Sequence, residues 1–530
     1  MKRMKLTLAG RLVVFVLVAA LVVGAGVVGV KYFAPAGLVD GFGSDSLNSP
    51  SNNNDKTPVA TQPKDPVQDG KDEVATINLS VDEWIGWEPI LHANNGLSTQ
   101  PGSIFDKMGL KVNIHVINDA DASSNALIKG DLDAAGYTIN RTAFLSGKFE
   151  KAGLDVVMPV FTNYSDGGDG IIALSKYNSI ESLLGAKIGV PRHSEAQSLV
   201  IWLINKSDKL TDEQKMQMIE DLNKHTFDDA EQTGLAFFAG ELDAAATWQP
   251  YLSNAENSTN SHILFDTSAA NNLILDGILF RADFAKAHPE VVSKFIDGVF
   301  QALETYESDF DTIRKCMPMF SGMSDDEIAS TRADAGMMNY AANLNALKNI
   351  CPIVYSDMCN IWESINEEVD HDLVSTLFDT RYLDALSDKY SALIQQPSFE
   401  ITEEQKEAAI DAEALLTKST TINFMANTAK FLDSAEASKV LKEFVDIAKT
   451  LDGTIIQIEG NINTKNASAE GIMLSENRAK TVRDFFVANG IDPNRIIVIG
   501  NGNSKMIADP DSEDAYMNRR TDVFFKIIEE

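Results

Sequence analysis

The feature that most constrains the fold of this chain is an internal repeat in its middle part. The segments ALIKGDLDAAGYT (Ala126–Thr138) and AFFAGELDAAATW (Ala236–Trp248) align without a gap. In each copy a helix is expected to end at a glycine suited to a left-handed C-cap, and an acidic turn then leads into a strand. Two similar α/β lobes are therefore expected, with a ligand-binding cleft beyond the carboxyl ends of their strands.

Short apolar strands alternate with helical stretches from Thr76 to about Leu386, which favours parallel βαβ units. The expected strands include Thr76–Ser80, Leu110–Val116, Leu154–Val160, Gly170–Leu174 and Ala186–Val190. The residues that follow each Asp-Ala-Ala, namely Tyr137 and Thr138 in one copy and Thr247 and Trp248 in the other, are candidates to reach the cleft.

A helix is expected to open near Ser194, where unpaired backbone N–H groups and the positive end of the helix dipole favour an anionic head group. Ser194 and Gln197 are candidate solute-binding residues, although Ser194 alone also fits a plain N-cap.

Other candidates lie in loops that are expected to border the cleft. Trp84, Trp87 and Trp248 could stack on a planar or cationic solute, with burial as structural tryptophans as the alternative. Asp169 and His193 are further candidates, for which a solvated loop position is the alternative.

Several motifs in this region have a familiar order and spacing. They include Gly86-Trp87-Glu88-Pro89, Asp169-Gly170-Ile171-Ile172, SIESLLGAKIGV at Ser179–Val190, AFFAGELDAAATWQPYL from Ala236, and Ala287-His288-Pro289-Glu290. The segment Thr76–Leu386 resembles the substrate-binding proteins of nitrate/taurine/sulfonate-type ABC importers, which include thiamine-precursor binders. The resemblance implies a hinged, two-lobed periplasmic-binding-protein fold (type II) that closes on a small solute, with an ABC permease as a partner.

The N-terminus predicts export. Met1–Arg11 carries four basic residues and no acid, and Leu12–Val30 is apolar over a length that suits one transmembrane helix. A cleaved signal peptide, with Ala34-Pro35-Ala36 as a loose cleavage site, is the alternative. Gly37–Ala75 is rich in Ser, Asn, Asp and Pro, so it is expected to be a flexible tether. The chain is therefore expected in the cytoplasmic (inner) membrane with its bulk extracytoplasmic.

Composition narrows the class of protein further. The 530 residues suggest three or four units, and 45 Lys+Arg against 77 Asp+Glu give a net charge of −32, which makes nucleic acid a poor partner. No H-x-x-x-H, C-x-x-C, G-x-S-x-G or P-loop pattern is present, so neither an enzyme nor a cofactor is expected. Of Cys316, Cys351 and Cys359, the last two could form a disulfide in an oxidising compartment.

The tail has the order of a separate β-α-β-α-β domain. Strands are expected at Thr421–Phe424, Thr454–Glu459, Ile496–Ile499 and Thr521–Ile528, and helices at Ala435–Thr450 and Ser475–Asn489. The motifs Leu474-Ser475-x-x-Arg478-Ala479, Gly490-Ile491-Asp492-x-x-Arg495 and Asn518-Arg519-Arg520 resemble the C-terminal domain family of OmpA, which is shared with flagellar-motor stator proteins.

The resemblance implies that this domain binds the diaminopimelate side chain of peptidoglycan, with Arg478 on its carboxylate and Arg519 nearby. The family's ammonium-binding aspartate is replaced by Asn463, which removes an ion pair. Arg519 and Arg520 also fit a purely structural role that braces the sheet.

The predicted organisation is a cytoplasmic stub and anchor (1–36), a linker (37–75), a two-lobed solute-binding domain (76–390), a linker with a helix (391–414) and an OmpA-like α/β sandwich (415–530). We expect a membrane-anchored solute-binding protein that docks on peptidoglycan. The alternative is a structural or sensory envelope protein that keeps the binding fold as a scaffold.

Overall fold

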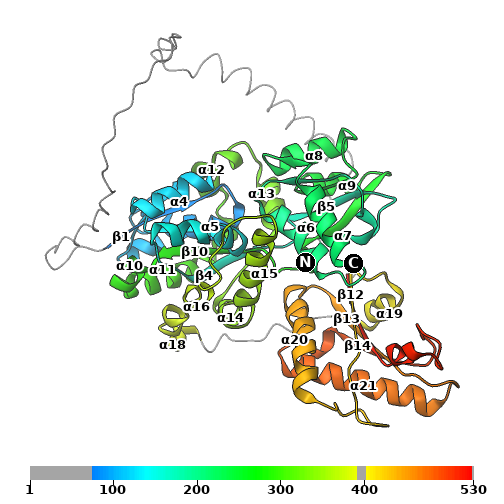
Figure 1. Ribbon diagram of the computed structural model, residues 1–530. Coiled ribbons are helices and arrows are strands. Elements are labelled where there is room, and N and C mark those ends of the chain that lie inside the picture. The colour runs from blue at the N-terminus through cyan, green and yellow to red at the C-terminus, as the bar shows by residue number, and fades with distance from the viewer. Residues whose placement is uncertain (1–74, 391–400, 528–530) are drawn as a thin grey trace, which may run out of the picture. The chain divides into compact units, whose positions relative to one another are not determined.

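The computed structural model describes residues 75–390 and 401–527 (Figure 1). The chain divides into two units, Met1–Gly70 and Lys71–Glu530, and all the described residues belong to the second unit. The expected membrane anchor at Leu12–Val30 lies outside the described residues. Within the described ranges, no helix combines the length and the apolar character needed to cross a membrane.

The first lobe is built on a six-stranded sheet with the order β11-β4-β10-β3-β1-β2. Its strands are β1 (Thr76–Val81), β2 (Lys111–Val116), β3 (Ala134–Thr138), β4 (Val156–Ser165), β10 (Leu275–Arg281) and β11 (Ala335–Met337). β1 pairs in parallel with β2 and β3, whereas β10 runs antiparallel between β3 and β4. The alternating residues Ile77, Leu79 and Val81 of β1 are buried, as a strand with a core-facing side requires.

Helices surround this sheet and extend the first lobe. They are α2 (Glu88–Asn94), α3 (Ile104–Lys107), α4 (Ala120–Lys129), α5 (Ile139–Ala152), α10 (Ala282–Ala287), α11 (Pro289–Ala302), α12 (Phe310–Cys316), α13 (Asp325–Arg332), α14 (Tyr340–Asn345), α15 (Cys351–Ser364), α16 (Val374–Leu377), α17 (Arg381–Asp384) and α18 (Ser387–Tyr390). α11 packs against α2, and α15 packs against α5 and against α6 (Glu195–Lys206) of the second lobe.

The second lobe has a five-stranded sheet with the order β7-β6-β8-β5-β9. Its strands are β5 (Asp169–Leu174), β6 (Ile188–Pro191), β7 (Thr226–Phe227), β8 (Ala244–Trp248) and β9 (Ser261–Asp266), and its helices besides α6 are α7 (Asp212–Leu222), α8 (Ala230–Phe238) and α9 (Tyr251–Glu256).

Two chain crossings connect the lobes, from β4 to β5 and from β9 back to β10. The crossings touch each other, since the hydroxyls of Ser165 and Thr267 are 2.8 Å apart and the Gly167 amide donates to Thr267 Oγ1 at 3.0 Å. A strand that returns to the first sheet after the second lobe, beside a paired double crossing, is the architecture expected of a two-lobed binding protein.

The internal repeat corresponds to equivalent positions in the two lobes. β3 and β8 are each a central strand, with a parallel neighbour on one side and an antiparallel neighbour on the other. Gly130 and Gly240, after the preceding helices, have left-handed φ values of 78° and 80°. These are the conformations that the glycines of the repeat predict.

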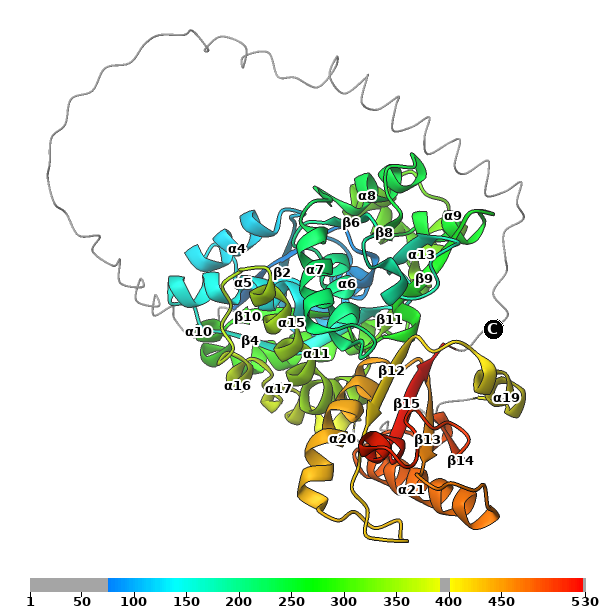
Figure 2. The same ribbon diagram turned by 45° about the vertical axis from the view of Figure 1, so that its right-hand side comes forward.

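The C-terminal region forms a four-stranded sheet with the order β12-β15-β13-β14, on which α21 packs along β13 and β14 (Figure 2). Its elements are α19 (Glu403–Asp411), β12 (Leu416–Thr420), α20 (Ser434–Thr450), β13 (Ile455–Asn461), α21 (Ala469–Ala488), β14 (Ile496–Gly502) and β15 (Thr521–Lys526). Gly460 of β13 allows α21 to approach closely, because a Cβ there would overlap the carbonyl oxygen of Ser475.

The expected first strand of this domain, Thr421–Phe424, is wrong. The strand is the more polar segment Leu416–Thr420, which pairs antiparallel with β15, while Phe424 forms only an isolated bridge with Phe431. The alternation of apolar residues in Thr421–Phe424 suggested a strand, but the backbone partners of β15 determine which segment forms the ladder.

The suggested disulfide between Cys351 and Cys359 does not form. Both residues lie in α15, and all three cysteines are free and buried. Eight helical residues separate their Cα atoms by about 12 Å along the axis, roughly twice the span of a disulfide.

Candidate functional site

Side chains of both lobes meet at the starts of α5 and α6. Thr138 caps α5 by accepting a hydrogen bond from the Arg141 amide at 2.8 Å, and its hydroxyl donates to Oε1 of Glu195 at 2.9 Å. Nη2 of Arg141 lies 3.2 Å from Oε2 of the same carboxylate. We call these three residues the lobe contact, because Glu195 belongs to the second lobe and the other two belong to the first.

Ser194 and Gln197 hold the loop that precedes α6. Ser194 is the N-cap, since its hydroxyl accepts from the Gln197 amide at 3.1 Å and donates to the Pro191 carbonyl at 2.8 Å. The buried side-chain oxygen of Gln197 accepts from the His193 amide at 2.6 Å. The N-cap interpretation of Ser194 is therefore correct, and solute contact by Ser194 or Gln197 stays a prediction.

His193 is engaged by neighbours other than a solute. Its backbone has a left-handed φ of 53°, its Nε2 lies 2.9 Å from Glu367, and its ring stacks on Phe144. Burial is the largest influence on the imidazole and lowers its pKa, against the opposing effect of Glu367.

The three candidate tryptophans lie in different environments. Trp87 is 1% exposed, and its indole N–H donates to Asp82 at 2.6 Å, so it holds Asp82 from within the core. Trp84 is partly exposed and donates to Oδ1 of Asn163 at 2.7 Å. Trp248 is 44% exposed at the end of β8, where it pairs in register with Asp169. Trp84 and Trp248 can thus present ring surface, whereas Trp87 is a structural tryptophan.

Four carboxylates gather around these residues: Asp82 after β1, Asp169 at the start of β5, Glu195 at the start of α6, and Asp276 in β10. We call them the acidic cluster. In the first sheet Asp276 pairs in register with Thr138 on one side and Asn163 on the other. Oδ2 of Asp169 accepts a hydrogen bond of 2.8 Å from the Ser165 hydroxyl.

The pKa values of three carboxyl groups in the acidic cluster are raised. Desolvation is the main reason that the pKa of Asp169 rises to about 6 and that the pKa of Asp276 lies well above its ordinary value. The charges of Asp82, Glu195 and Asp169 raise the pKa of Asp276 further. Desolvation raises the pKa of Asp82 as well, although Asp82 keeps an exposed surface.

Sequence reasoning identified Asp169 but missed the other three carboxylates. A signal was present for Asp82, which directly follows the first expected strand, where ligands of open α/β sheets are bound. Asp276 had no such signal, because only the return of β10 into the first sheet brings it beside Thr138.

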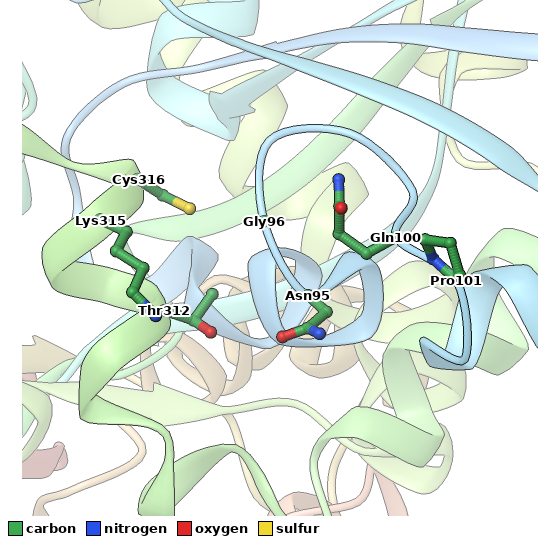
Figure 3. A pocket seen from close by; sticks show the side chains of 7 residues that line it. All are labelled: Asn95, Gly96, Gln100, Pro101, Thr312, Lys315 and Cys316. Atoms are coloured by element: carbon green, nitrogen blue, oxygen red, sulfur yellow. The ribbon is translucent and has the colours of Figure 1, made fainter.

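A separate hollow of about 370 Å³ lies on the first lobe, between the turn after α2 and helix α12 (Figure 3). It is lined by Asn95, Gly96, Gln100, Pro101, Thr312, Lys315 and Cys316. It contains none of the residues predicted to bind solute, and burial raises the pKa of its thiol, Cys316, which disfavours a reactive thiolate.

The candidate peptidoglycan site contains two arginines without an acidic partner among the described ion pairs. Arg478 of α21 donates from Nε to the Thr428 carbonyl at 3.1 Å and lies over the Phe424 ring. Burial, followed by the nearby positive charge of Arg519, lowers the pKa of Arg478. Arg519 is exposed, whereas Arg520 bonds to Asp522 at 3.0 Å and braces the sheet. Two neighbouring guanidinium groups without an acidic partner favour an anionic group such as a carboxylate.

Asn463 lies in the loop after β13 and is held by its neighbours. Its Oδ1 accepts from Nδ2 of the buried Asn518 at 3.1 Å, and its Nδ2 lies 3.4 Å from the Pro510 carbonyl. Asn518 in turn accepts from the amides of Ile507 and Ala508. The side chain of Asn463 is therefore oriented, and an oxygen at this position can accept a ligand N–H but offers no charge.

Comparison with known proteins identifies the C-terminal region. Residues 423–520 match the model of the OmpA family. The chain is also 31% identical over 120 residues to outer membrane protein A of Bordetella avium. That alignment covers 22% of this chain and spans 60% of the length of the relative.

Two solved structures that are similar to the N-terminal lobes are those of periplasmic binding proteins. The periplasmic aliphatic sulphonate binding protein SsuA of Escherichia coli is 16% identical, with 58% of this chain and 99% of that chain covered and a TM-score of 0.43. The periplasmic nitrate-binding protein NrtA of Synechocystis PCC 6803 is 13% identical, with 61% and 92% covered and a TM-score of 0.43. Because these scores are low, the two-lobed fold rests on the strand orders and paired crossings described above. The chain thus joins a two-lobed α/β region to an OmpA domain.

Proposed function

We propose that this chain is an exported solute-binding protein that captures a small solute between its two lobes and docks on peptidoglycan through its OmpA domain. The single observation that carries the first part is the convergence of polar side chains from both lobes beside a paired double crossing. Such a crossing acts as a hinge, and lobes that turn about it can enclose a ligand.

Delivery to an ABC permease is the natural consequence of solute capture outside the membrane. Similar solved structures include a sulphonate-binding and a nitrate-binding protein, which agrees with this role. The N-terminal anchor expected from the sequence would keep the lobes near such a permease. Docking on peptidoglycan would hold the other end of the chain at the wall, in the extracytoplasmic envelope.

The peptidoglycan part of the proposal is supported by the family match and by the two arginines without acidic partners, Arg478 and Arg519. Co-sedimentation of the full chain with purified sacculi tests it. The parent protein is expected to pellet, Arg478→Ala to stay in the supernatant, and Arg483→Ala, a partly exposed arginine of the same helix that pairs with Asp484, to pellet as the parent does. Equal pelleting of all three would overturn the assignment of Arg478.

Solute capture is tested by a thermal-shift screen of the full chain against sulfonates, nitrate, phosphonates, thiamine precursors and amines. A saturable increase in Tm with at least one class is expected, since a ligand that binds only the folded state stabilises it.

A structural or sensory envelope protein is the second candidate. One observation favours it: Thr138 and Arg141 contact Glu195 directly, so the two lobes are joined by their own side chains. This candidate predicts peptidoglycan binding without any solute response, so the same two experiments separate it from the first.

A further inference from the structure

The four members of the acidic cluster come from four separate segments, and three of them, Asp276, Glu195 and Asp169, are connected through intermediate residues. Thr138, which pairs with Asp276 in the sheet, bonds to Glu195 of the other lobe. Asn163, on the other side of Asp276, accepts from the Trp84 indole. The Trp84 ring in turn lies against Gly168, the residue before Asp169. A Cβ added to Gly168 would be 3.3 Å from the Trp84 ring.

Positive charge does not balance these carboxylates. Arg141 pairs with Glu195, whereas the donors to the other three carboxylates are neutral. Asp82 accepts from the Trp87 indole and the Trp84 amide, Asp169 accepts from the Ser165 hydroxyl, and Asp276 accepts from the Trp84 indole. Asp276 is 5% exposed, and within the described part of the chain no basic side chain forms an ion pair with it. A buried carboxylate without a cation is costly to ionise, and a positive ligand at this place would supply the missing counter-charge.

A second group near the lobe contact, the side-chain oxygen of Asn140, lacks a hydrogen-bond donor among the described residues. Asn140, fully buried beside Arg141, donates from Nδ2 to Ser198 of α6 at 2.9 Å, but its Oδ1 accepts no hydrogen bond in the described structure. The unsatisfied group at the lobe contact is thus an acceptor, like the carboxylates.

We infer that the solute held between the lobes is a small organic cation with N–H donors, of the amine, amidine or guanidine class. This inference rests on the proposed function, namely that the lobes bind a solute. Asp276 and Asp169 receive the cationic nitrogen, Asp82 is positioned by Trp87 to accept a further N–H, and the ring of Trp84 is available to stack on the cation.

The electrostatics agree with this assignment. Burial, followed by the charges of neighbouring carboxylates, raises the pKa values of Asp169 and Asp276, and a bound cation would favour their ionised forms. A sulfonate or nitrate would instead be repelled by the negative charge of these carboxylates. Among the described residues, no three acidic, histidine or cysteine side chains are placed to share one metal ion, so a cation extended over several bonds fits better than a single metal ion.

Isothermal titration calorimetry of the detergent-solubilised full chain at pH 7.5 tests the inference. The probes are putrescine, spermidine and agmatine, with taurine, nitrate and Mg²⁺ as comparisons. At least one amine is expected to bind saturably. Asp276→Asn is expected to weaken that binding about tenfold or more, because the charge-assisted hydrogen bond is lost while the shape is kept.

The control is Asp326→Asn, which removes the same charge from an exposed position in the first turn of α13 and should bind as the parent does. Circular dichroism and pelleting with sacculi show whether each variant is folded. If taurine or nitrate binds and no amine does, the inference is overturned while the proposed function stands. If Mg²⁺ alone binds, or if Asp276→Asn binds amines as tightly as the parent, the inference also fails. If no solute of either charge binds, the proposed function itself fails.

Discussion

The hydroxyl of Thr138 in the first lobe donates a 2.9 Å hydrogen bond to the carboxylate of Glu195 in the second. The same carboxylate pairs with Arg141, so one side chain holds the start of α5 to the start of α6. This contact therefore holds the two lobes together beside the acidic cluster.

Glu195→Ala should remove the contacts with Thr138 and Arg141 that hold the two lobes together. Without solute, the lobes are expected to separate more often, and the backbone amides at the starts of α5 and α6 should exchange with deuterium faster than in the parent protein. Glu213→Ala, at an exposed position in the first turn of α7, is the control and should leave these amides unchanged. Unaltered exchange in Glu195→Ala would show that the contact does not hold the lobes.

The acidic cluster should reduce the stability of the unliganded protein at neutral pH. The pKa of Asp169 rises to about 6 in the folded state from its ordinary value of 3.8, so the folded state binds more protons than the unfolded state between these values. Its contribution to stability therefore falls as pH rises from about 4 to 6 and stays lower above that.

Asp169→Asn removes this titration. It is expected to raise the free energy of unfolding at pH 7.5 by on the order of 1–3 kcal/mol and to change it little at pH 4. Chemical denaturation of parent and variant at both pH values measures the difference. A variant that is less stable than the parent at pH 7.5 would mean that the Asp169 charge is compensated in the folded protein.

Gly86 has a specific packing role between Trp84 and Trp87. A Cβ at this position would overlap the side chain of Asn163, the acceptor of the Trp84 indole bond. Gly86→Ala is expected to destabilise the fold by about 1–3 kcal/mol and to weaken solute binding. Gly322→Ala, which meets open space, is the control. Wild-type stability of Gly86→Ala would contradict the packing described for Asn163.

Asn463→Asp should strengthen peptidoglycan binding. An aspartate can still accept from Asn518, which is 3.1 Å from the present oxygen, and it adds an ion pair to a ligand ammonium. The gain is expected to be about tenfold in affinity, on the order of 1–2 kcal/mol, as measured by the fraction pelleted across a series of sacculus concentrations. If the variant pellets no better than the parent, the ligand ammonium does not lie near residue 463.

The sequence predicted the lobes well because their signals are local. Each copy of the repeat carries its own C-capping glycine and its own strand, and these features require no knowledge of distant neighbours. The first strand of the C-terminal domain was misplaced because the pairing of Leu416–Thr420 with β15 joins segments about a hundred residues apart.

The candidate site was only partly predictable for the same reason. Thr138, Ser194 and Trp248 follow from the ends of helices and strands, and Asp169 follows from the crossing. Asp276 reaches the site only through the return of β10 between β3 and β4. The burial of Trp87 likewise depends on tertiary packing against Gly136.

Native mass spectrometry of the full chain, extracted gently from the cells that make it, tests most directly whether the two lobes hold a small solute. We expect the parent protein to carry a small-molecule adduct whose identified structure contains a basic nitrogen, and Asp276→Asn to have lost it. An adduct-free parent that also gives no response to amines, sulfonates or nitrate would contradict solute binding by these lobes.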